Sequence, residues 1–417
     1  MINPFKPLLW KVAGLAVAVL AAVFFLTPKT SPTHARIVRV MKAPFPSLER
    51  AELLLALGKK RIHSNEIKAD GLSFTVKGKP VTAKLTIDQA LQERIEDVYD
   101  QYDPDYAAFV AMDPETGKIL AMVDRSADGR DNLALSATFP AASVFKIVTS
   151  AAALDERKIQ PRTVVPVNGS FGTLYKRNLR DQITRWTRYI SIEEAFAKSV
   201  NTAFARIAMK NLGPQDLQKY ANSFGFNQQI PFDLPIEASS AIVPADDSFG
   251  LAESGSGYTR RQTLNPIQGA MIASAIINDG QMPAPYIVEN VRSEKGSMLY
   301  EAELKKFSQP IDKNTAHNLS MIMEHTITQG TARKEYRDYN HHPVLSKVFV
   351  GAKTGSLTGD NPAGRYDWFV GFAQSSSNPK HKIAFASLII NCKYWKVKSS
   401  HIAREAIINY FGRKTDL

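Results

Sequence analysis

The chain has 417 residues, of which 44% are hydrophobic and 22% charged, and its formal net charge is +12. This composition is typical of a globular protein with one large domain or two smaller ones, so a mainly disordered chain is not the default interpretation. The positive charge favours anionic partners such as nucleic acid, phospholipid headgroups or acidic wall polymers, without choosing among them.

The N-terminus predicts a membrane anchor. Residues 12–26 are uninterrupted apolar or small, and residues 7–10 extend this stretch to about the length that crosses a bilayer. A cleaved signal peptide is the competing interpretation, but no clear small-x-small cleavage site follows. We therefore favour a cytoplasmic stub and uncleaved anchor over residues 1–28, with the rest of the chain on the outer side of the cytoplasmic membrane. This placement argues against nucleic acid as a partner.

Residues 29–82 predict a linker or a small accessory element, because Pro, Lys and short mixed segments alternate there. Strong patterning then begins, and we assign residues 83–417 to one compact domain. The first predicted helix carries Leu91, Ile95 and Val98 on one face, with Thr86 or Asp88 as its cap. Next, "YAAFVAMDPETGKILAMVD" predicts a β-hairpin around a Pro-Glu-Thr-Gly turn.

The middle of the domain is helical. A helix is expected from residue 143 to about 156, and a capping box of Ser191 and Glu194 begins two short helices that end near Gly213. Further helical pattern follows in "NPIQGAMIASAIINDG" and "NTAHNLSMIMEHTITQG".

In the last hundred residues the spacing of the apolar residues changes from a helical to a strand-like period. Three β-rich runs, "SKVFVGAKTGS", "YDWFVGFAQ" and "HKIAFASLIINCKYW", are separated by "LTGDNPAGR" and "SSSNP" turns, and "SHIAREAIINYFG" predicts a final helix. The single cysteine, Cys392, excludes an intramolecular disulfide and is expected in a buried strand. The predicted fold class is α+β, with a central antiparallel sheet built from N- and C-terminal segments, flanking helices and a mainly helical subdomain.

The first candidate for chemistry is the pair Ser143 and Lys146, which are three residues apart at the start of a predicted helix. Positions i and i+3 share one helix face, so the amine can reach the hydroxyl. A lysine activates a serine only if burial or a nearby cation lowers its pKa. The alternative is a simple N-cap serine and a snorkelling lysine, and the pair alone does not decide. A second copy, Ser377 and Lys380, lies in a polar turn beside Pro379 and is interpreted as a solvated loop.

Two further elements offer complementary groups. Ser199 and Asn201 supply a hydroxyl and an amide at a junction between helices, where capping is the plainer interpretation. Lys353, Thr354, Gly355 and Ser356 lie at the end of an apolar strand, where they offer a cation, two hydroxyls and backbone N–H groups for a carboxylate or an oxyanion.

Together, Ser143-x-x-Lys146, Ser199-x-Asn201 and Lys353-Thr354-Gly355 resemble the three-motif set of penicillin-binding proteins and serine β-lactamases. The resemblance extends over roughly residues 84–411, where "VAMDPETGKILAMV", "TLNPIQGAMIASAIINDG" and "YDWFVGFA" look like the transpeptidase domain of penicillin-binding proteins. It implies that fold, with one N-terminal transmembrane helix.

The resemblance also implies roles for the motif residues. Ser143 would be the acylated nucleophile and Lys146 its base, while Ser199 would relay protons and Asn201 would hold the substrate's amide. The terminal carboxylate would bind Lys353, Thr354 and Ser356, and the backbone N–H groups of Ser143 and Ser356 would form the oxyanion hole. One physical argument agrees: a second cation at Lys353 would help lower the pKa of Lys146.

The chain departs from the family pattern in two ways. Many members place Pro-Gly before the nucleophile, whereas this chain has Ala141 and Ala142, which we expect to stiffen the turn without altering the chemistry. In addition, the segment between the anchor and the domain is too short for the large pedestal of typical monofunctional synthases, and no glycosyltransferase domain fits.

The expected function is a membrane-anchored peptidoglycan D,D-transpeptidase that joins a D-Ala-D-Ala donor to an amine acceptor and is inhibited by β-lactams. It would need no metal or organic cofactor, and a separate glycan polymerase is a candidate partner. The alternatives are a D,D-carboxypeptidase using the same site, a non-catalytic β-lactam-binding scaffold of a wall-synthesis complex, a β-lactam sensor and a β-lactamase. A β-lactamase would need rapid deacylation, and a β-lactam sensor would need a cytoplasmic signalling domain.

Overall fold

The computed structural model describes residues 48–413, apart from residues 61–65, 68–70 and 131. The predicted anchor, residues 1–28, and the first part of the predicted 29–82 segment lie outside these residues. Among the helices within the described ranges, none combines the length and the apolar character that crossing a bilayer requires.

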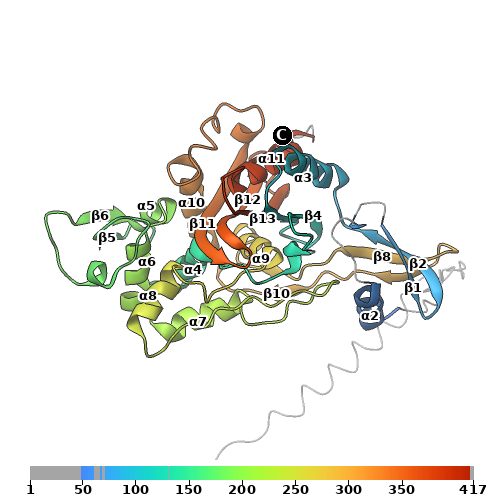
Figure 1. The fold of residues 1–417 in the computed structure, drawn as a ribbon, viewed down its shortest axis with the longest axis horizontal. Coiled ribbons are helices and arrows are strands. Elements are labelled where there is room, and N and C mark those ends of the chain that lie inside the picture. The colour runs from blue at the N-terminus through green and yellow to red at the C-terminus, as the bar shows by residue number, and fades with distance from the viewer. Residues whose placement is uncertain (1–47, 61–65, 68–70, 131, 414–417) are drawn as a thin grey trace, which may run out of the picture. The chain divides into compact units, whose positions relative to one another are not determined.

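The centre of the fold is a five-stranded antiparallel sheet with the order β11-β12-β13-β3-β4 (Figure 1). Its strands are β3 (Tyr106–Met112), β4 (Ile119–Ser126), β11 (Val348–Asp360), β12 (Ala363–Ser375) and β13 (Lys382–Asn391). Because β13 pairs with β3, the two ends of the domain meet in mid-sheet. This confirms the expected antiparallel sheet built from N- and C-terminal segments.

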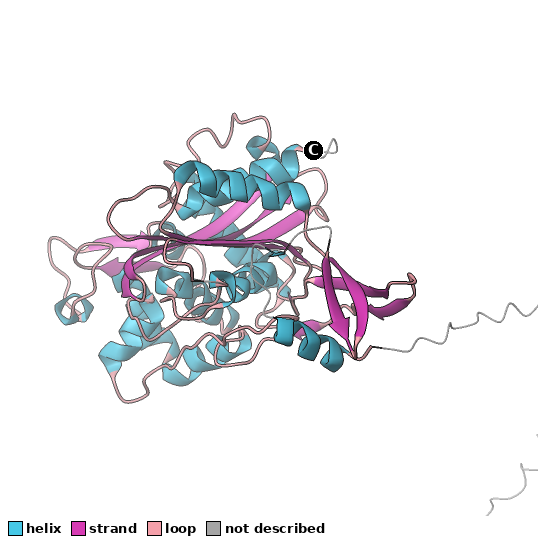
Figure 2. Cartoon of the chain, turned by 45° about the vertical axis from the view of Figure 1, so that its right-hand side comes forward, coloured by secondary structure: helices cyan, strands magenta, loops and turns pink. Residues whose placement is uncertain are grey.

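Helices cover both faces of this sheet (Figure 2). Alternate residues of β3 belong to different cores: Phe109 packs in the cluster that contains Leu91 of α3 and Ile402 of α11, whereas Val110 packs in the cluster that contains Ile267 of α9. The period-two alternation of a strand therefore separates two hydrophobic layers. The helices that provide these layers are α3 (Gln89–Tyr102), α9 (Pro266–Ile277) and α11 (Ser399–Gly412).

The cap of α3 is Asp88, whose side chain accepts a hydrogen bond of 3.1 Å from the Leu91 N–H. The other predicted cap, Thr86, instead donates its hydroxyl to the carbonyl oxygen of Ile119 at 2.6 Å, so it ties the start of the helix to β4. Leu91, Ile95 and Val98 are all buried, which confirms the predicted apolar face.

The helical subdomain contains the predicted helices and a small hairpin. Its elements are α4 (Lys146–Asp155), β5 (Val164–Val167), β6 (Arg188–Ser191), α5 (Ile192–Ala197), α6 (Asn201–Ile207), α7 (Pro214–Ser223), α8 (Ser248–Ser256) and α10 (Lys313–Thr328). A π-turn, η5 (Ala208–Leu212), leads from α6 to Gly213. Ser191 caps α5 as predicted, but the Glu194 carboxylate binds Lys198 at 2.7 Å, so we observe only the serine half of the capping box.

The chain before residue 83 forms more than a linker. It provides α2 (Arg50–Lys60), β1 (Leu72–Val76) and β2 (Lys79–Leu85), and β2 pairs with β8 (Val288–Ser293), which pairs with β9 (Met298–Glu301). The boundary that we predicted between residues 82 and 83 falls inside β2. Two short strands, β7 (Met282–Pro283) and β10 (Lys306–Ser308), form a separate pair.

Two local expectations were wrong. The segment "LTGDNPAGR" is mostly strand, because β11 continues to Asp360 and β12 begins at Ala363, which leaves only two residues for the turn. Cys392 is exposed, because β13 ends one residue earlier. Its N–H donates to a carboxylate oxygen of Asp105 at 2.9 Å, which turns the chain away from the sheet.

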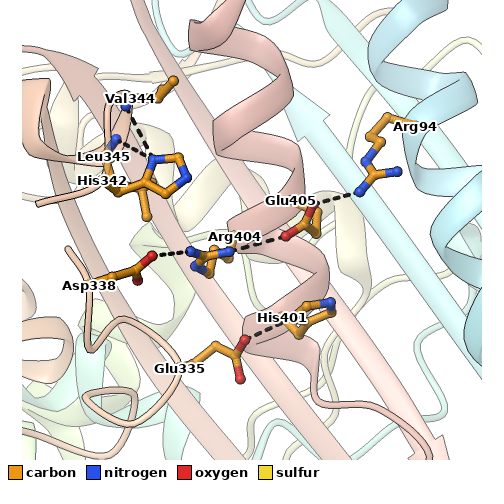
Figure 3. A network of polar contacts seen from close by, with 9 residues as sticks. All are labelled: Arg94, Glu335, Asp338, His342, Val344, Leu345, His401, Arg404 and Glu405. Carbon is orange, nitrogen blue, oxygen red and sulfur yellow. Dashed lines mark hydrogen bonds and ion pairs between the residues drawn. The ribbon is translucent and has the colours of Figure 1, made fainter.

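A network of charged side chains joins α3 and α11 to the segment after α10 (Figure 3). Arg404 donates to Asp338 at 2.6 Å and to Glu405 at 3.2 Å, and Glu405 also accepts from Arg94 at 2.7 Å. His401 Nδ1 lies 2.8 Å from Glu335, and this contact lowers the pKa of the Glu335 carboxyl. The network therefore ties Glu335 and Asp338, in the segment after α10, to α11, and through Glu405 it ties α11 to α3.

Replacing Arg404 by alanine is expected to lower the free energy of unfolding by about 1–3 kcal/mol, because it takes one of two partners from the largely buried Glu405 carboxylate and removes the arginine that the part-exposed Asp338 carboxylate binds. Urea titration followed by circular dichroism measures this loss. The matched control is Lys313→Ala, which removes a well-exposed pair with Asp279 and should change the stability by less than about 0.5 kcal/mol. Equal stabilities of the two variants would contradict the importance of the network.

Candidate active site

Ser143 lies in a tight turn and not in an α-helix. Residues Ala142–Phe145 form a 3-10 helix, η3, and α4 begins only at Lys146. In a 3-10 helix residues i and i+3 are eclipsed, so the expected pairing is kept. Lys146 Nζ lies 2.6 Å from Ser143 Oγ. Ser143 itself is half-buried.

The Lys146 amine is fully buried and has three oxygen neighbours. Besides Ser143 Oγ, these are Asn201 Oδ1 at 2.7 Å and the carbonyl oxygen of Ser256 at 2.6 Å. Burial lowers its pKa well below the ordinary value, and the nearby Lys353 cation lowers it further. Asn201 Oδ1 and the carbonyl oxygen can only accept. A neutral amine supplies one hydrogen to each, and its lone pair is then left for the Ser143 hydroxyl proton.

Ser199 and Asn201 lie at the junction of α5 and α6, as predicted. The Asn201 N–H donates to the carbonyl oxygen of Phe171, and its Nδ2 donates to that of Gly172, both at 2.9 Å. These bonds hold the amide so that Oδ1 is directed to Lys146. Ser199 has a φ of 55°, in the left-handed region, which turns the chain sharply between the two helices.

Lys353 is the second buried lysine of the site. Its Nζ lies 2.9 Å from Ser199 Oγ and 2.8 Å from the carbonyl oxygen of Thr354, and burial lowers its pKa to about 7. Thr354 Oγ1 lies 2.6 Å from Thr331 Oγ1. Two hydrogen-bonded groups therefore lie side by side: one contains Ser143, Lys146 and Asn201, and the other contains Lys353 and Ser199.

The strand β11 approaches the nucleophile turn closely. A Cβ atom at Gly355 would lie 3.1 Å from a methyl of Val144 and 3.3 Å from the carbonyl oxygen of Ala141, so only glycine fits there easily. Ser356 follows and is exposed, with its Oγ 3.4 Å from Asp367. Among the described strands β11 is an edge strand that pairs with β12 alone, so its other edge makes no strand pairing there and could pair with a peptide ligand.

Ala142 adopts the left-handed conformation, with a φ of 50°. This conformation costs a residue other than glycine about 1 kcal/mol. Glycine, which many penicillin-binding proteins carry at this position, would adopt it without strain. Gly257 makes the turn possible from the other side, because a Cβ atom at Gly257 would lie 2.0 Å from the Ala142 carbonyl oxygen.

The structure thus brings together all eight sequence-predicted site residues, and it adds three that we did not predict. Ser256 acts through its backbone carbonyl, for which no side-chain signal exists. Thr331 meets Thr354 from a distant segment, and Asp367 supports Ser356 while it accepts two hydrogen bonds from Ser399. The second Ser-x-x-Lys copy, Ser377 and Lys380, is exposed in the turn between β12 and β13, as expected.

A family model described as the penicillin binding protein transpeptidase domain matches residues 107–409. Among curated proteins, the chain is 29% identical over 340 residues to the peptidoglycan D,D-transpeptidase PbpA of Mycolicibacterium smegmatis, covering 73% of this chain and 65% of the relative. It is 27% identical to stage V sporulation protein D of Bacillus subtilis, covering 66% of this chain and 44% of the relative. The chain therefore spans less than two thirds of the length of these relatives.

Solved structures share the overall fold. The D,D-transpeptidase domain of a peptidoglycan glycosyltransferase from Eggerthella lenta matches with a TM-score of 0.65 and 25% identity, over 80% of this chain and 84% of that one. A ceftriaxone acyl-enzyme complex of penicillin-binding protein A from M. tuberculosis matches with a TM-score of 0.63 and 26% identity, over 79% of each chain.

Proposed function

The chain belongs to the penicillin-binding protein transpeptidase domain family, and from this we propose that it is a serine-type peptidoglycan D,D-transpeptidase. The observation that carries the proposal is the Lys146 amine, fully buried and 2.6 Å from Ser143 Oγ. The names of the relatives, a D,D-transpeptidase and an acyl-enzyme of a penicillin-binding protein, support the same activity.

In the first half-reaction Ser143 Oγ attacks the carbonyl carbon between the two terminal D-alanines of a donor stem peptide. The hydroxyl proton passes to the neutral Lys146 amine, whose other two contacts already satisfy its hydrogens. The C–N bond then breaks, and the departing amine takes a proton. D-alanine leaves, and the rest of the donor stays bound to Ser143 as an ester. Ser199 is the candidate relay for this proton by the family resemblance, and its hydroxyl lies 2.9 Å from Lys353 Nζ.

The second half-reaction transfers the acyl group to an amine of a neighbouring stem peptide. The acceptor amine attacks the ester carbonyl carbon and gives a proton to the Lys146 amine. The C–O bond to Ser143 then breaks, and Ser143 Oγ takes the proton back and becomes a hydroxyl again. The backbone N–H groups of Ser143 and Ser356 are the candidate oxyanion donors in both steps. The donor's terminal carboxylate is assigned to the Lys353 cation with the hydroxyls of Thr354 and Ser356, and Asn201 has a second Nδ2 hydrogen for the peptide amide.

The remaining expectations complete the proposal. Residues 1–28 would anchor the chain in the cytoplasmic membrane, and the rest of the chain would work on the outer side. The net charge of +12 suits an anionic wall and lipid environment. A separate glycan polymerase would supply the strands that this site joins, and β-lactams would acylate Ser143 as mimics of the donor.

The test is a transfer assay with the full chain, a peptide ending in D-Ala-D-Ala and a peptide that offers a free amine. We expect mass spectrometry to detect a product in which the donor has lost one D-alanine and gained the acceptor, and we expect benzylpenicillin pretreatment to stop its formation. Hydrolysed donor alone, at saturating acceptor, would establish a carboxypeptidase instead. No product, with penicillin still bound covalently, would establish a non-catalytic scaffold.

A further inference from the structure

A buried carboxyl group lies behind the hydroxyl of Ser356. Asp367 is in β12, directly opposite Ser356 in β11, so the two side chains are on the same face of the sheet. Ser356 is exposed, whereas Asp367 is only 6% exposed. Asp367 Oδ1 lies 3.4 Å from Ser356 Oγ. A ligand at Ser356 is therefore separated from Asp367 by the serine hydroxyl.

The two oxygens of the Asp367 carboxyl group have different partners. Oδ2 accepts hydrogen bonds from the N–H and from the hydroxyl of Ser399, the first residue of α11, and both are 2.9 Å long. Because Oδ2 already faces two donors, a proton on the same oxygen would point at their hydrogens. When Asp367 is protonated, the proton is therefore on Oδ1, the oxygen that faces Ser356.

The protonation of Asp367 sets the direction of its contact with Ser356. An ionised carboxylate can only accept, so Ser356 gives its hydrogen to Oδ1 and turns its lone pairs outward. A protonated Asp367 donates from Oδ1 to Ser356 Oγ, and the hydrogen of Ser356 is then free for an acceptor. At 3.4 Å the contact is longer than a strong O–H···O bond, so the hydroxyl can change between the two arrangements.

Thr354, the other hydroxyl assigned to the donor's carboxylate, has a different partner. Its Oγ1 lies 2.6 Å from the Oγ1 of Thr331, and each hydroxyl of this pair can donate or accept. The pair therefore offers a hydrogen to a ligand at any pH. The direction of the Ser356 hydroxyl, in contrast, depends on a group that titrates.

The surroundings of Asp367 favour its neutral form. Burial raises the pKa of the Asp367 carboxyl, while the bonds from Ser399 and Ser356 and the charge of Lys398 act in the opposite direction. Its partner in β13 is the apolar Ile389. Asp367 therefore keeps its proton to a higher pH than an exposed aspartic acid does.

We propose that Asp367 is a positioning residue for the carboxylate end of the donor, and that it acts by setting the direction of the Ser356 hydroxyl. With its proton on Oδ1, Asp367 makes Ser356 a donor to the terminal carboxylate. When that proton leaves to solvent, the Ser356 hydrogen rotates to Oδ1, and the serine presents lone pairs that repel the carboxylate. Asp367 itself does not touch the donor. This inference rests on the proposed function, since it concerns the donor of the same reaction.

The experiment measures the affinity of benzylpenicillin for the full chain carrying Ser143→Ala, which lacks the acylated oxygen, by ligand-observed NMR titration from about pH 5 to about pH 9. The second chain also carries Asp367→Asn, which keeps an oxygen for Ser399 and offers an N–H to Ser356 at every pH. We expect equal affinities at the acidic end and about tenfold tighter binding by the Asp367→Asn chain at the alkaline end. Loss of the Lys353 charge weakens both chains equally, so it cancels in their ratio.

Two variants test whether the effect passes through Ser356. Ser399→Ala removes a hydroxyl that stabilises the ionised carboxylate, so the weakening of binding should move to higher pH. If Asp367 only held α11 in place, this pH would not move. In a Ser356→Ala background, Asp367→Asn should leave the affinity unchanged, because the group that transmits its effect is gone.

The matched control is Asp233→Asn. Asp233 is also buried and also accepts from backbone N–H groups, but it pairs with Arg50 of α2, so this change should leave the affinity unaltered at every pH.

An affinity ratio between the Asp367→Asn chain and its parent that stays near one at all pH values would overturn the proposal. A ratio that survives Ser356→Ala, or failure of benzylpenicillin to bind even at acidic pH, would do the same. Binding in the Ser143→Ala chain needs no turnover, so it is independent of the transfer assay. The expected ratio without any transfer by the unmodified chain would sustain the positioning role and refute the transpeptidase.

Discussion

Replacement of Ser143 by alanine is expected to abolish covalent capture of benzylpenicillin. The change removes only the oxygen that lies 2.6 Å from Lys146 Nζ, and alanine fits the half-buried position, so the fold should persist. Loss of a catalytic serine lowers rates by about 10⁴-fold or more, since no other group can form the ester. Intact-mass spectrometry of the full chain after incubation with the drug detects the one-drug adduct directly.

The matched control is Ser377→Ala, which alters the second Ser-x-x-Lys copy. Because Ser377 and Lys380 are exposed in a turn, this variant should form the adduct at the rate of the unmodified protein. An adduct that persists in Ser143→Ala but disappears in Ser377→Ala would refute the assignment of the nucleophile. Rapid drug turnover without an adduct would indicate a β-lactamase.

Replacement of Lys146 by methionine should lower the acylation rate by about 10²–10⁴-fold, the range attributed to a general base. Methionine approximately keeps the buried volume but cannot accept the Ser143 proton. The rate of adduct formation is measured by rapid mixing, quenching at set times and mass spectrometry. Lys198→Met is the control, because that lysine is exposed and its side chain binds Glu194 alone among the residues that the structure describes, and it should leave the rate unchanged.

The pH dependence provides a second measurement on the same variant. In the unmodified protein the rate should rise with pH as the Lys146 ammonium, whose pKa is lowered by burial and by Lys353, loses its proton. It should fall again when Lys353, with a pKa of about 7, loses the charge that attracts a carboxylate. In Lys146→Met the rising limb should disappear. An unchanged rising limb would mean that another group is the base.

Much of the fold follows from local patterns. The hairpin β3–β4, the helices α9 and α10 and the C-terminal strands were predictable because each carries its own periodicity and turn residues over a few neighbouring positions. The four-stranded sheet β1-β2-β8-β9 was not predictable, because β2 pairs with β8, which is far away in the sequence. Neither strand alone reveals its partner. The short turn between β11 and β12 was missed because its flanking glycines lie within paired strands.

Some parts of the candidate site could also be predicted from the sequence, and others could not. Ser143, Lys146, Ser199, Asn201 and Lys353 were identifiable because their side-chain types and spacings are specific in combination. The Ser256 carbonyl could not be identified, since every residue has one. The departure from Pro-Gly at Ala141 and Ala142 was visible in the sequence, but the backbone strain at Ala142 was not, because it follows from a φ of 50°.

The strand order has a consequence for the synthesis of the chain. Tyr106 in β3 pairs with Ile390 in β13, so one edge of β3 stays open until β13, almost 300 residues later, has left the ribosome. Such distant pairing is slow, because a long loop must close before any contact rewards it. The Lys353 cation, which helps to make Lys146 a base, arrives with the same late strands. The nascent chain therefore holds its serine before it holds the electrostatic environment that makes the serine reactive.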